Sequence, residues 1–562
     1  MRRAAEAFKF RPLLSVLMPV YNPKILWLQE AIESVRSQIY PDWELCIADD
    51  ASTDPEVRTL LERYIKKDPR IKVVFREKNG HISAASNSAL QLAEGKWVAL
   101  LDHDDLLSEC ALFRVAEVLQ QHPETCLIYS DEDKIDEESR RVEPYFKSDW
   151  NYDLFLSHNM ISHLGVYQTQ LLREIGGLRV GMEGSQDYDL ALRCLEVIGG
   201  DKIRHIPQVL YHWRIHKASE AARSGGSKPY ARLAGEKALN EFLQRRKIGA
   251  RAKMMKDHGY RVRYDLPAPL PFVSLMILTR NGLPLIQKCV KSILRKTLYS
   301  HYEILIIDNG SDDPGTLRYL EHLAHNKKIR VIRDGRPFNY SALNNAAVRA
   351  AAGELVCFLN NDIEVISSGW LSELVSLAVQ PGVGAVGARL WYLDRTLQHG
   401  GVILGLGGIA SHSHRGLRRG APGYLGRAEL LQSFSAVTAA CLMIRKSLFE
   451  RMGGFNEYDL PIAYNDVDLC IRIREAGYRN VWTPYAELWH REAATRGNDR
   501  SPETQTRFIS ECDYMKKTWG DLLLKDPAYN PNLTLDSADY RLAWPPRGTV
   551  EKQCGSSVPA NA

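Results

Sequence analysis

The sequence predicts two tandem α/β domains, each built around a mainly parallel sheet. Three observations carry this prediction: the length of 562 residues exceeds what one hydrophobic core usually serves, short apolar runs alternate with segments of helical periodicity, and one ordered set of landmarks occurs twice. We expect domains at 12–263 and 273–500, with a proline-containing linker at 264–272. A C-terminal helix and a disordered tail are expected over 501–562.

The repeat begins with an apolar run that ends in a polar loop and leads into an amphipathic stretch. SVLMPVYN starts at Ser15 in the first copy, and SLMILTRN starts at Ser274 in the second. Thirty-four residues after each serine, a second apolar run ends in a polar pair. These pairs are Asp49 with Asp50 and Asp308 with Asn309. Because open parallel sheets bind ligands at the carboxyl ends of their strands, we expect both pairs to face a crevice.

A third run follows a glycine, and seven residues after that glycine a polar cluster begins. The first copy reads GKWVALLDHDD, with Asp102 and Asp104 one residue apart, and the second reads GELVCFLNNDI, with Asn360 and Asp362. Oxygen ligands so placed suit Mg²⁺ or Mn²⁺. An alternative interpretation is that Asp104 or Asp105 caps the following helix, as aspartate commonly does.

Two further landmarks complete the repeat. SQDYDLALR contains Asp187 and YNDVDLCIR contains Asp466, both in segments of helical periodicity, where a carboxylate can act as a general base toward a hydroxyl. For Asp189, which follows on another face of the first helix, we expect a structural role. The last landmark, PQVLYH or PYAELWH, ends in His212 or His490. Either histidine is a metal ligand or an ordinary structural residue.

The ordered set SVLMPVYN, CIADDASTD, LLDHDD, SQDYDLALR and LYHW resembles the inverting glycosyltransferases of family 2. The second copy resembles bacterial members that act on cell-surface polysaccharides, including rhamnosyltransferases of O-antigen assembly. The resemblance implies the GT-A type of fold, with a Rossmann-like mixed sheet. It also implies a nucleotide-diphosphate sugar donor, a glycan or lipid-linked glycan acceptor, Mg²⁺ or Mn²⁺, and inversion by single displacement.

Carried over by position, the resemblance assigns site residues in both copies. Asp187 and Asp466 would be the catalytic bases. The residues that would contact the donor are Pro19, Tyr21, Asp49, Asp50, Arg76, Asp102, Asp308, Asn309 and Asn360. The residues that would hold the metal are Asp102, Asp104, His212, Asp362 and His490. For Asp50, which would contact the nucleotide base, a turn-forming role in DDASTD is the alternative.

The second copy departs from the family pattern at two positions. Asn360 replaces the first carboxylate of the metal-binding pair, and Asn309 replaces the aspartate that would contact the base. A neutral amide is the weaker metal ligand, because a charge pair at ~4 Å is worth roughly 4 kcal/mol at an effective dielectric of 20. We expect two active sites, the second binding metal loosely or only with the donor. The alternatives are one active domain beside a degenerate, acceptor-positioning domain, or a non-catalytic nucleotide-sugar-binding assembly protein.

Composition argues against several other classes. The net charge of +5 is close to balanced, so a nucleic-acid partner is not indicated. Ten scattered cysteines and the lack of an apolar run near ~20 residues predict a reduced, cytoplasmic protein without a signal peptide or membrane span. No G-x-G-x-x-G opens a helix after the first strand of either copy, which speaks against a dinucleotide-dependent oxidoreductase.

Two basic stretches and one glycine-rich stretch remain. The basic stretches, 245–253 and 414–420, are solvated faces or peripheral contacts with anionic lipid at the inner membrane face. The glycine-rich stretch, 399–416, is expected to be a solvated loop. As an alternative, His412, His414 and Arg415 of this stretch reach a diphosphate or an anionic acceptor.

Overall fold

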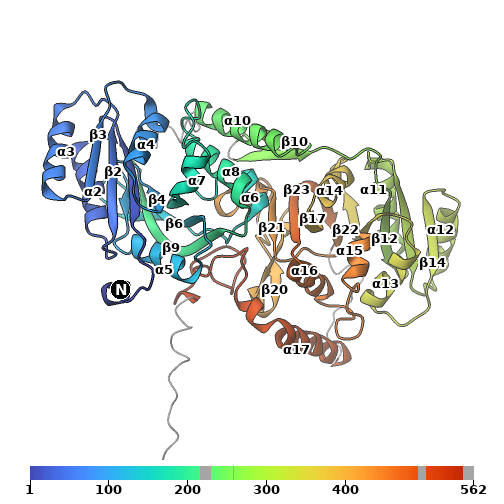
Figure 1. Cartoon of the computed structure of the whole chain (residues 1–562). Coiled ribbons are helices and arrows are strands. Elements are labelled where there is room, and N and C mark those ends of the chain that lie inside the picture. The colour runs from blue at the N-terminus through green and yellow to red at the C-terminus, as the bar shows by residue number, and fades with distance from the viewer. Residues whose placement is uncertain (216–228, 257–258, 492–501, 548–562) are drawn as a thin grey trace, which may run out of the picture. The chain divides into compact units, whose positions relative to one another are not determined.

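The computed structural model describes residues 1–215, 229–256, 259–491 and 502–547. The chain divides into two compact units, 1–262 and 263–562, and both contain a mixed sheet with helices on its faces (Figure 1). The predicted fold class is therefore confirmed. The exact domain limits stay predictions, and the predicted disorder of the last dozen residues concerns a segment outside the described residues.

The first unit is built on a nine-stranded sheet in the order β3-β2-β1-β4-β8-β6-β9-β5, with β7 paired to β6. Its strands are β1 (Leu14–Val20), β2 (Trp43–Asp49), β3 (Ile71–Phe75), β4 (Trp97–Leu100), β5 (Leu106–Leu107), β6 (Leu127–Ile135), β7 (Arg141–Tyr145), β8 (Gly165–Gln168) and β9 (Ile203–Arg214). Its helices are α1 (Arg2–Glu6), α2 (Ile25–Arg36), α3 (Pro55–Lys67), α4 (His81–Leu92), α5 (Ala111–Gln121), α6 (Tyr152–Ser157), α7 (Thr169–Glu174), α8 (Gln186–Ile198) and α10 (Pro229–Arg245). A separate hairpin joins β10 (Ala250–Met254) to β11 (Tyr260–Tyr264).

The second unit is built on a ten-stranded sheet in the order β14-β13-β12-β15-β22-β17-β23-β16, with β18 on β17 and β21 on β23. Its strands are β12 (Val273–Thr279), β13 (Tyr302–Asp308), β14 (Ile329–Arg333), β15 (Leu355–Asn360), β16 (Ile363–Val365), β17 (Val383–Trp391), β18 (Leu397–His399), β21 (Gln432–Phe434), β22 (Cys441–Arg445) and β23 (Arg479–His490). Its helices are α11 (Leu283–Lys296), α12 (Pro314–Ala324), α13 (Tyr340–Ala350), α14 (Trp370–Ala378), α15 (Lys446–Arg451), α16 (Asn465–Glu475) and α17 (Pro502–Leu524). A hairpin pairs β19 (Val402–Leu404) with β20 (Ala410–His412).

The eight strands in the main path of each sheet follow the same order. In each, the first strand along the chain is parallel to its two neighbours, the β4–β8 and β15–β22 pairs are antiparallel, and the β6–β9 and β17–β23 pairs are parallel. Polar clusters that follow matching strands therefore lie at matching edges. The repeat read from the sequence thus corresponds to one topology used twice.

A buried three-residue contact sets the register of the central strands in both units. Ser15 Oγ donates to Glu44 Oε1 at 2.6 Å and accepts from Gly95 N at 2.9 Å. The same contact recurs around Ser274 with the same two distances. A Cβ on Gly95 would lie 2.5 Å from Ser15 Oγ, and one on Gly353 would lie 2.5 Å from a backbone nitrogen. The glycine of the third landmark is therefore required by this close approach.

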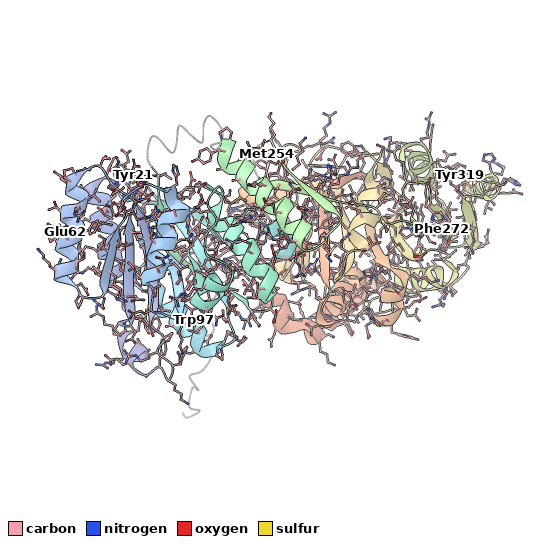
Figure 2. All side chains as sticks on the ribbon, turned by 45° about the horizontal axis from the view of Figure 1, so that its top comes forward. Tyr21, Glu62, Trp97, Met254, Phe272 and Tyr319 are labelled. Carbon is pink, nitrogen blue, oxygen red and sulfur yellow. The ribbon has the colours of Figure 1, made fainter. Side chains whose placement is uncertain are left out.

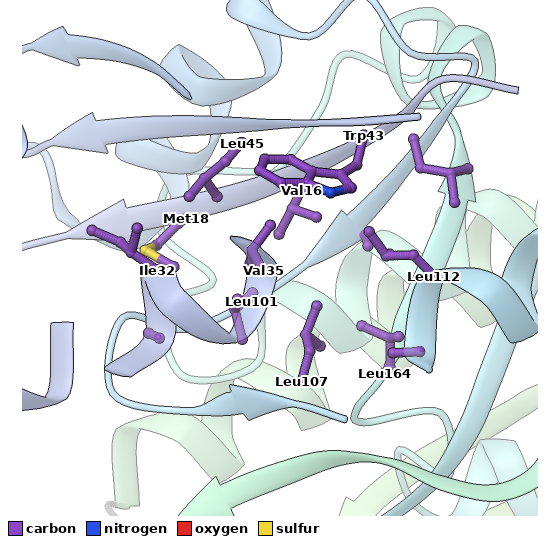
Figure 3. Close-up of a cluster of buried hydrophobic side chains, with 14 of the residues drawn as sticks. Val16, Met18, Ile32, Val35, Trp43, Leu45, Leu101, Leu107, Leu112 and Leu164 are labelled. Carbon is purple, nitrogen blue, oxygen red and sulfur yellow. The ribbon is translucent and has the colours of Figure 1, made fainter. Parts of the chain in front are cut away.

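The core of the first unit lies where α2 packs on β1 and β2 (Figure 3). Helix α2 buries one stripe of residues at helical spacing, namely Leu28, Ala31, Ile32 and Val35. They meet strand residues labelled in Figure 3, among them Val16, Met18, Trp43 and Leu45. Each fully buried aliphatic side chain contributes roughly 1.5–3 kcal/mol through burial, so this packing anchors the strand ends that carry the polar clusters.

The glycine-rich stretch is largely buried, so the expectation of a solvated loop is wrong. The segment after α17 holds it in place: Leu404 N donates to Asp526 Oδ2 at 2.6 Å. His414 Nε2 accepts a hydrogen bond from Tyr424 N at 3.1 Å. Burial, aided by nearby arginines, lowers the pKa of His414 to about 3. A neutral imidazole bonded in this way is not placed to bind a diphosphate.

Within the described ranges, no helix is both long and apolar enough to cross a bilayer. The basic stretch 245–253 is mostly exposed, although Arg245 pairs with Glu196 at 2.6 Å. Contact of this stretch with lipid, and a cytoplasmic location, stay predictions.

A buried ion pair in the first unit predicts a pH-dependent stability. Burial alone lowers the pKa of His205, but Asp131 at 2.9 Å and Asp149 at 3.0 Å outweigh it and raise the pKa to about 9. The unfolded pKa is near 6.5, so this stabilisation is complete below pH 6.5 and lost as the pH rises through 9. We expect the unfolding free energy to fall by about 3 kcal/mol over this window. Urea unfolding at pH 6 and 9.5 measures it, and an equal pH dependence in His205→Gln would contradict the assignment.

Candidate active sites

The first unit brings together a carboxylate of the third landmark and a histidine from elsewhere in the sequence. Asp102 follows β4, Asp105 precedes β5, and His163 lies two residues before β8. One ligand atom from each of these side chains lies within 4.8 Å of the other two. Two carboxylates and an imidazole in this arrangement form a group that can hold a divalent cation.

The electrostatics of this group favour a bound cation. Burial raises the pKa of Asp102, and the charge of Asp104 adds to the effect while His163 opposes it. Burial likewise raises the pKa of Asp105 well above its usual range. Asp105 Oδ2 accepts from the Tyr211 hydroxyl at 2.6 Å, whereas no described residue donates a hydrogen bond to the Asp102 carboxylate. A cation would supply the partner that the half-buried Asp102 lacks.

A buried ion pair holds the backbone that carries His163. Lys147 Nζ donates to the carbonyl oxygens of Ile161 and His163, both at 2.6 Å, and to Glu132 Oε2 at 3.2 Å. His163 N donates to the same Glu132 oxygen at 2.9 Å. The imidazole stacks on Tyr211 with a centroid distance of 4.4 Å. The backbone of His163 and its ring are thus both held before any ligand arrives.

Asp187 lies in the first turn of α8 and is half-buried. Asn159 Nδ2 donates to its Oδ2 at 2.7 Å. Burial raises the pKa of Asp187, against the lowering effects of His163 and of hydrogen bonds that include the one from Asn159. A carboxylate with a raised pKa is a stronger base near neutral pH. Its charge also acts on Asp102, so the two carboxylates share one site.

The structural role expected for Asp189 is confirmed. Asp189 is fully buried and accepts hydrogen bonds from Arg179 and, at 2.9 Å, from Arg193. Asp468 and Arg472 form the same i,i+4 pair in the second unit, at 2.9 Å. The arginine of each pair also donates to a carbonyl oxygen of the preceding loop, that of Gly177 at 2.6 Å or of Gly454 at 2.8 Å, and so ties the helix of each candidate base to that loop.

The residues predicted to contact the nucleotide lie at the end of β2. Asp50 is buried, and its carboxylate accepts from Arg76 and from Gly80 N, the latter at 3.0 Å. Asp49 Oδ1 accepts from Ser52 N at 3.3 Å. The structure therefore brings Asp50 and Arg76 together, and both could face the base of a nucleotide.

Three further predicted residues surround this edge of the first sheet. The carbonyl oxygen of Pro19 accepts from His103 Nδ1 at 3.1 Å. Tyr21 is 45% exposed and lies on the surface of the first unit (Figure 2). Asp104 is half-buried. The helix-capping alternative for Asp104 or Asp105 is wrong, because α5 begins only at Ala111, after β5.

His212 makes a different contact from the one that the resemblance implies. Its Nδ1 bonds to Asp133 Oδ1 at 2.5 Å, and Arg141 Nε donates to the other oxygen of Asp133 at 2.5 Å. In the described part of the first unit, the histidine that joins Asp102 is His163. The metal-binding role of His212 stays a prediction.

The histidines of the fifth landmark occupy different places in their sheets. Leu107 and Val365 are equivalent, because each amide donates to a serine hydroxyl of the helix that follows the first strand of the sheet, at 3.2 and 3.0 Å. Leu107 pairs with Tyr211, one residue before His212. Val365 pairs with Leu488, two residues before His490. A shift of one residue turns a strand side chain to the opposite face. His490 therefore faces its polar cluster while His212 faces Asp133.

The second unit has a related but less charged cluster. His490 Nε2 lies 3.2 Å from Asn360 Nδ2 and 3.3 Å from Asp362 Oδ1. Asp362 Oδ1 and His490 Nδ1 are buried without a hydrogen-bond partner. Within the described part of this unit, no three-ligand group of histidine, cysteine or acidic side chains is found. Two side chains that can ligate a metal thus stand beside a neutral amide.

The candidate base of the second unit repeats that of the first. Asp466 lies in the first turn of α16, and its Oδ2 accepts from Ala439 N at 2.9 Å. Burial raises the pKa of Asp466, although hydrogen bonds from Ala439 and Thr438 oppose the shift.

The nucleotide end of the second unit differs in charge. Asn309 Nδ2 donates to the carbonyl oxygens of Asp334 and Arg336, at 3.0 and 2.8 Å, and its Oδ1 is buried without a partner. Asp308 Oδ1 accepts from Ser311 N at 2.9 Å. A free amide oxygen here can accept a hydrogen bond from a ligand, where Asp50 of the first unit is already paired.

Residues 15–176 and 274–453 match the model of glycosyl transferase family 2. The chain belongs to this family. Over 95% of its length it is 50% identical to the uncharacterized protein y4gI of Sinorhizobium fredii, covering 59% of that protein. Over its full length it is 38% identical to the O-antigen biosynthesis protein RfbC of Myxococcus xanthus, covering 43% of that protein. The chain thus spans about half the length of these curated relatives.

A crystal structure of GalNAc-T7 with UDP, GalNAc and Mn²⁺ is also similar, with 16% identity and a TM-score of 0.39 over 48% of this chain and 51% of that one. The family 2 match ends before both candidate bases, at residues 176 and 453. The roles of Asp187 and Asp466 therefore depend on their position and environment, and they stay predictions.

Proposed function

We propose that the chain is an inverting glycosyltransferase with two active sites, each moving a sugar from a nucleotide-diphosphate donor to a glycan or lipid-linked glycan acceptor. The observation that carries this proposal is the pairing, in the first unit, of a half-buried carboxylate of raised pKa, Asp187, with a group that can hold a cation. Family membership and the identity to an O-antigen biosynthesis protein support a surface polysaccharide as the product.

In the first site, Asp187 takes the proton from the acceptor hydroxyl as that oxygen attacks the anomeric carbon. Asn159 donates to one oxygen of this carboxylate and so restricts its orientation. Asp102, Asp105 and His163 would hold Mg²⁺ or Mn²⁺, which when bound neutralises charge on the departing diphosphate. Asp50 and Arg76 would contact the nucleotide base.

The second site would use Asp466 in the same role, with Asn360, Asp362 and His490 around the diphosphate. Because this group has one carboxylate where the first has two, it binds a metal weakly or only together with the donor diphosphate. The unpartnered atoms of Asp362 and His490 favour an active site over a degenerate, acceptor-positioning domain.

A donor panel tests the proposal. The full chain is incubated with UDP-, dTDP- and GDP-sugars, with Mg²⁺ or Mn²⁺ and a range of acceptors, and release of nucleoside diphosphate is measured. We expect release with at least one donor and a requirement for the metal. No release with any combination would favour the non-catalytic, nucleotide-sugar-binding alternative.

The environment of Asp187 predicts how the pH profile of the first site responds to Asn159→Ala. In the native protein, the hydrogen bond from Asn159 lowers the pKa of Asp187. Its removal by the substitution therefore raises this pKa further. A general base works when deprotonated, so the acidic limb of the rate profile moves to higher pH. The profile is measured in an Asp466→Asn background, which isolates the first site. An unmoved limb would contradict the assignment of Asp187 as the base.

A further inference from the structure

A surface hollow of about 690 Å³ lies in the second unit, apart from the polar cluster at the strand ends. Helices α13, α15 and α16, which contribute to its lining, cover the same face of the second sheet, and α17 lies beside α16 (Figure 1). The residues used below are Arg349, Glu450, Asn456, Glu457, Tyr458 and Tyr514, all part of the lining.

Many of the side chains around the hollow are aromatic or carry a planar polar group. Two of them make no described side-chain contact within the protein. Tyr458 is 88% exposed, although tyrosine is on average a half-buried residue, and its ring has no described side-chain partner. The guanidinium of Arg349 has no ion pair or hydrogen bond among the described residues. Glu457 is held in place by Asn345 Nδ2 at 3.2 Å. Tyr514 adds a second ring from α17.

In the described part of the first unit, a side chain fills the place that matches this hollow. Gly177 and Gly454 are equivalent, since a Cβ on either would lie within 2.5 Å of an asparagine side chain of the facing helix. Two residues later in the first unit, Arg179 spans the gap and pairs with Asp189 and, at 2.7 Å, with Glu241 of α10.

In the second unit the residue at this place is Asn456, whose Nδ2 turns back to Asp459 at 3.1 Å. Asp468, the equivalent of Asp189, accepts from Trp519 Nε1 of α17 at 3.0 Å. In the first unit the corresponding donor is Arg179 of the loop. The arginine of the first unit is thus replaced by a short side chain, and the position matching Gly181 carries the exposed Tyr458. The side chain that fills this place in the first unit is therefore missing where the hollow lies in the second unit.

We propose that this hollow binds an internal stretch of a neutral glycan, the chain whose end is the acceptor of the second site. The proposal rests on the proposed function. Tyrosine rings stack on the C–H faces of sugars, and planar polar side chains bond to their hydroxyls. The lining has two arginines and three acidic residues, namely Arg349, Arg472, Glu450, Glu457 and Asp468, so it offers no excess of positive charge to a polyanionic chain.

The position of the hollow fits an acceptor that extends from the active site. Helix α16 carries Asp466 in its first turn and lines the hollow with Asp468 and Arg472. At a rise of about 1.5 Å per residue, the six residues from Asp466 to Arg472 span roughly 9 Å. A chain whose end lies at Asp466 needs to extend only a short way to reach the tyrosines.

Affinity electrophoresis of the full chain tests the proposal without donor or metal. The gels contain rhamnan, mannan, galactan or glucan, with chondroitin as an anionic polymer, and the proteins are wild type, Tyr458→Ala, Tyr514→Ala and the double variant. Val180→Ala, at the matching loop of the first unit, is the control. We expect retardation by at least one neutral polysaccharide, and a dissociation constant raised about tenfold by Tyr458→Ala, which at 88% exposure does not disturb folding.

Three results would overturn the proposal: no retardation by any neutral polymer, equal retardation of wild type and the double variant, or tyrosine-dependent retardation by chondroitin alone. Since binding is read without transfer, failure here is distinct from failure in the donor panel. An Asp466→Asn variant that loses transfer and keeps retardation would support both.

Discussion

Replacing Asp187 with asparagine is expected to lower transfer by the first site by about 10²–10⁴-fold while leaving donor binding intact. The amide keeps the shape of the side chain and a hydrogen-bonding oxygen for Asn159, but it cannot take a proton from the acceptor. Asp466→Asn is expected to act in the same way on the second site. Each variant removes one of two transfers if both sites are active.

The measurement is release of nucleoside diphosphate and the size of the product for both single variants and the double variant. Asp201→Asn, on the exposed surface of the first unit, is the control. If Asp466→Asn left every transfer unchanged, the second domain would be the degenerate, acceptor-positioning one. If neither variant changed any transfer, the assignment of both bases would be wrong.

A reciprocal exchange at the third landmark is expected to exchange the metal requirements of the two sites. Asp102→Asn removes a carboxylate with no hydrogen-bond donor of its own, so the Mn²⁺ concentration for half-maximal activity of the first site should rise roughly 10- to 100-fold. Asn360→Asp adds a carboxylate beside His490, 3.2 Å from the present amide nitrogen, and should lower the requirement of the second site.

Mn²⁺ titrations in Asp466→Asn and Asp187→Asn backgrounds separate the sites, and electron paramagnetic resonance of Mn²⁺ measures binding without turnover. Asp104→Asn serves as a comparison, because Asp104 lies beside the group without belonging to it. Equal metal affinities for Asp102→Asn and the parent would show that the cation binds elsewhere.

The sheet architecture could be predicted because it depends on local and periodic signals. Each buried strand reads as an apolar run, and the equal spacing from Ser15 to Asp49 and from Ser274 to Asp308 reflects two strands in one register. Asp187 and Asp466 are recognisable for the same reason, since each lies in the first turn of a helix that recurs in the repeat.

The ligands around Asp102 could not be predicted in full. His163 and Asn159 lie in a segment that belongs to no landmark, and only the folded chain brings them to Asp102 and Asp187. Asp105 appeared as one of two possible helix caps, since the sequence does not show that β5 separates it from α5.

The different orientations of His212 and His490 also could not be predicted from the sequence. The β6–β9 ladder shifts register on either side of Asp131, and the β17–β23 ladder shifts between Ala388 and Arg389. Such irregularities arise from pairing between distant strands, and each inserted residue reverses the face of those that follow. Two similar motifs, LYHW and LWHR, therefore end with their histidines on opposite faces.

The contact that joins Ser15, Glu44 and Gly95 has a consequence for how such a chain diversifies. It lies at the start of the central strands, whereas the polar clusters lie at their ends. A substitution at the carboxyl end of a strand therefore does not touch the contact that aligns the strands. The two units accordingly differ at their strand ends, where Asn309 and Asn360 stand in place of Asp50 and Asp102, while the contact at the strand starts is the same in both.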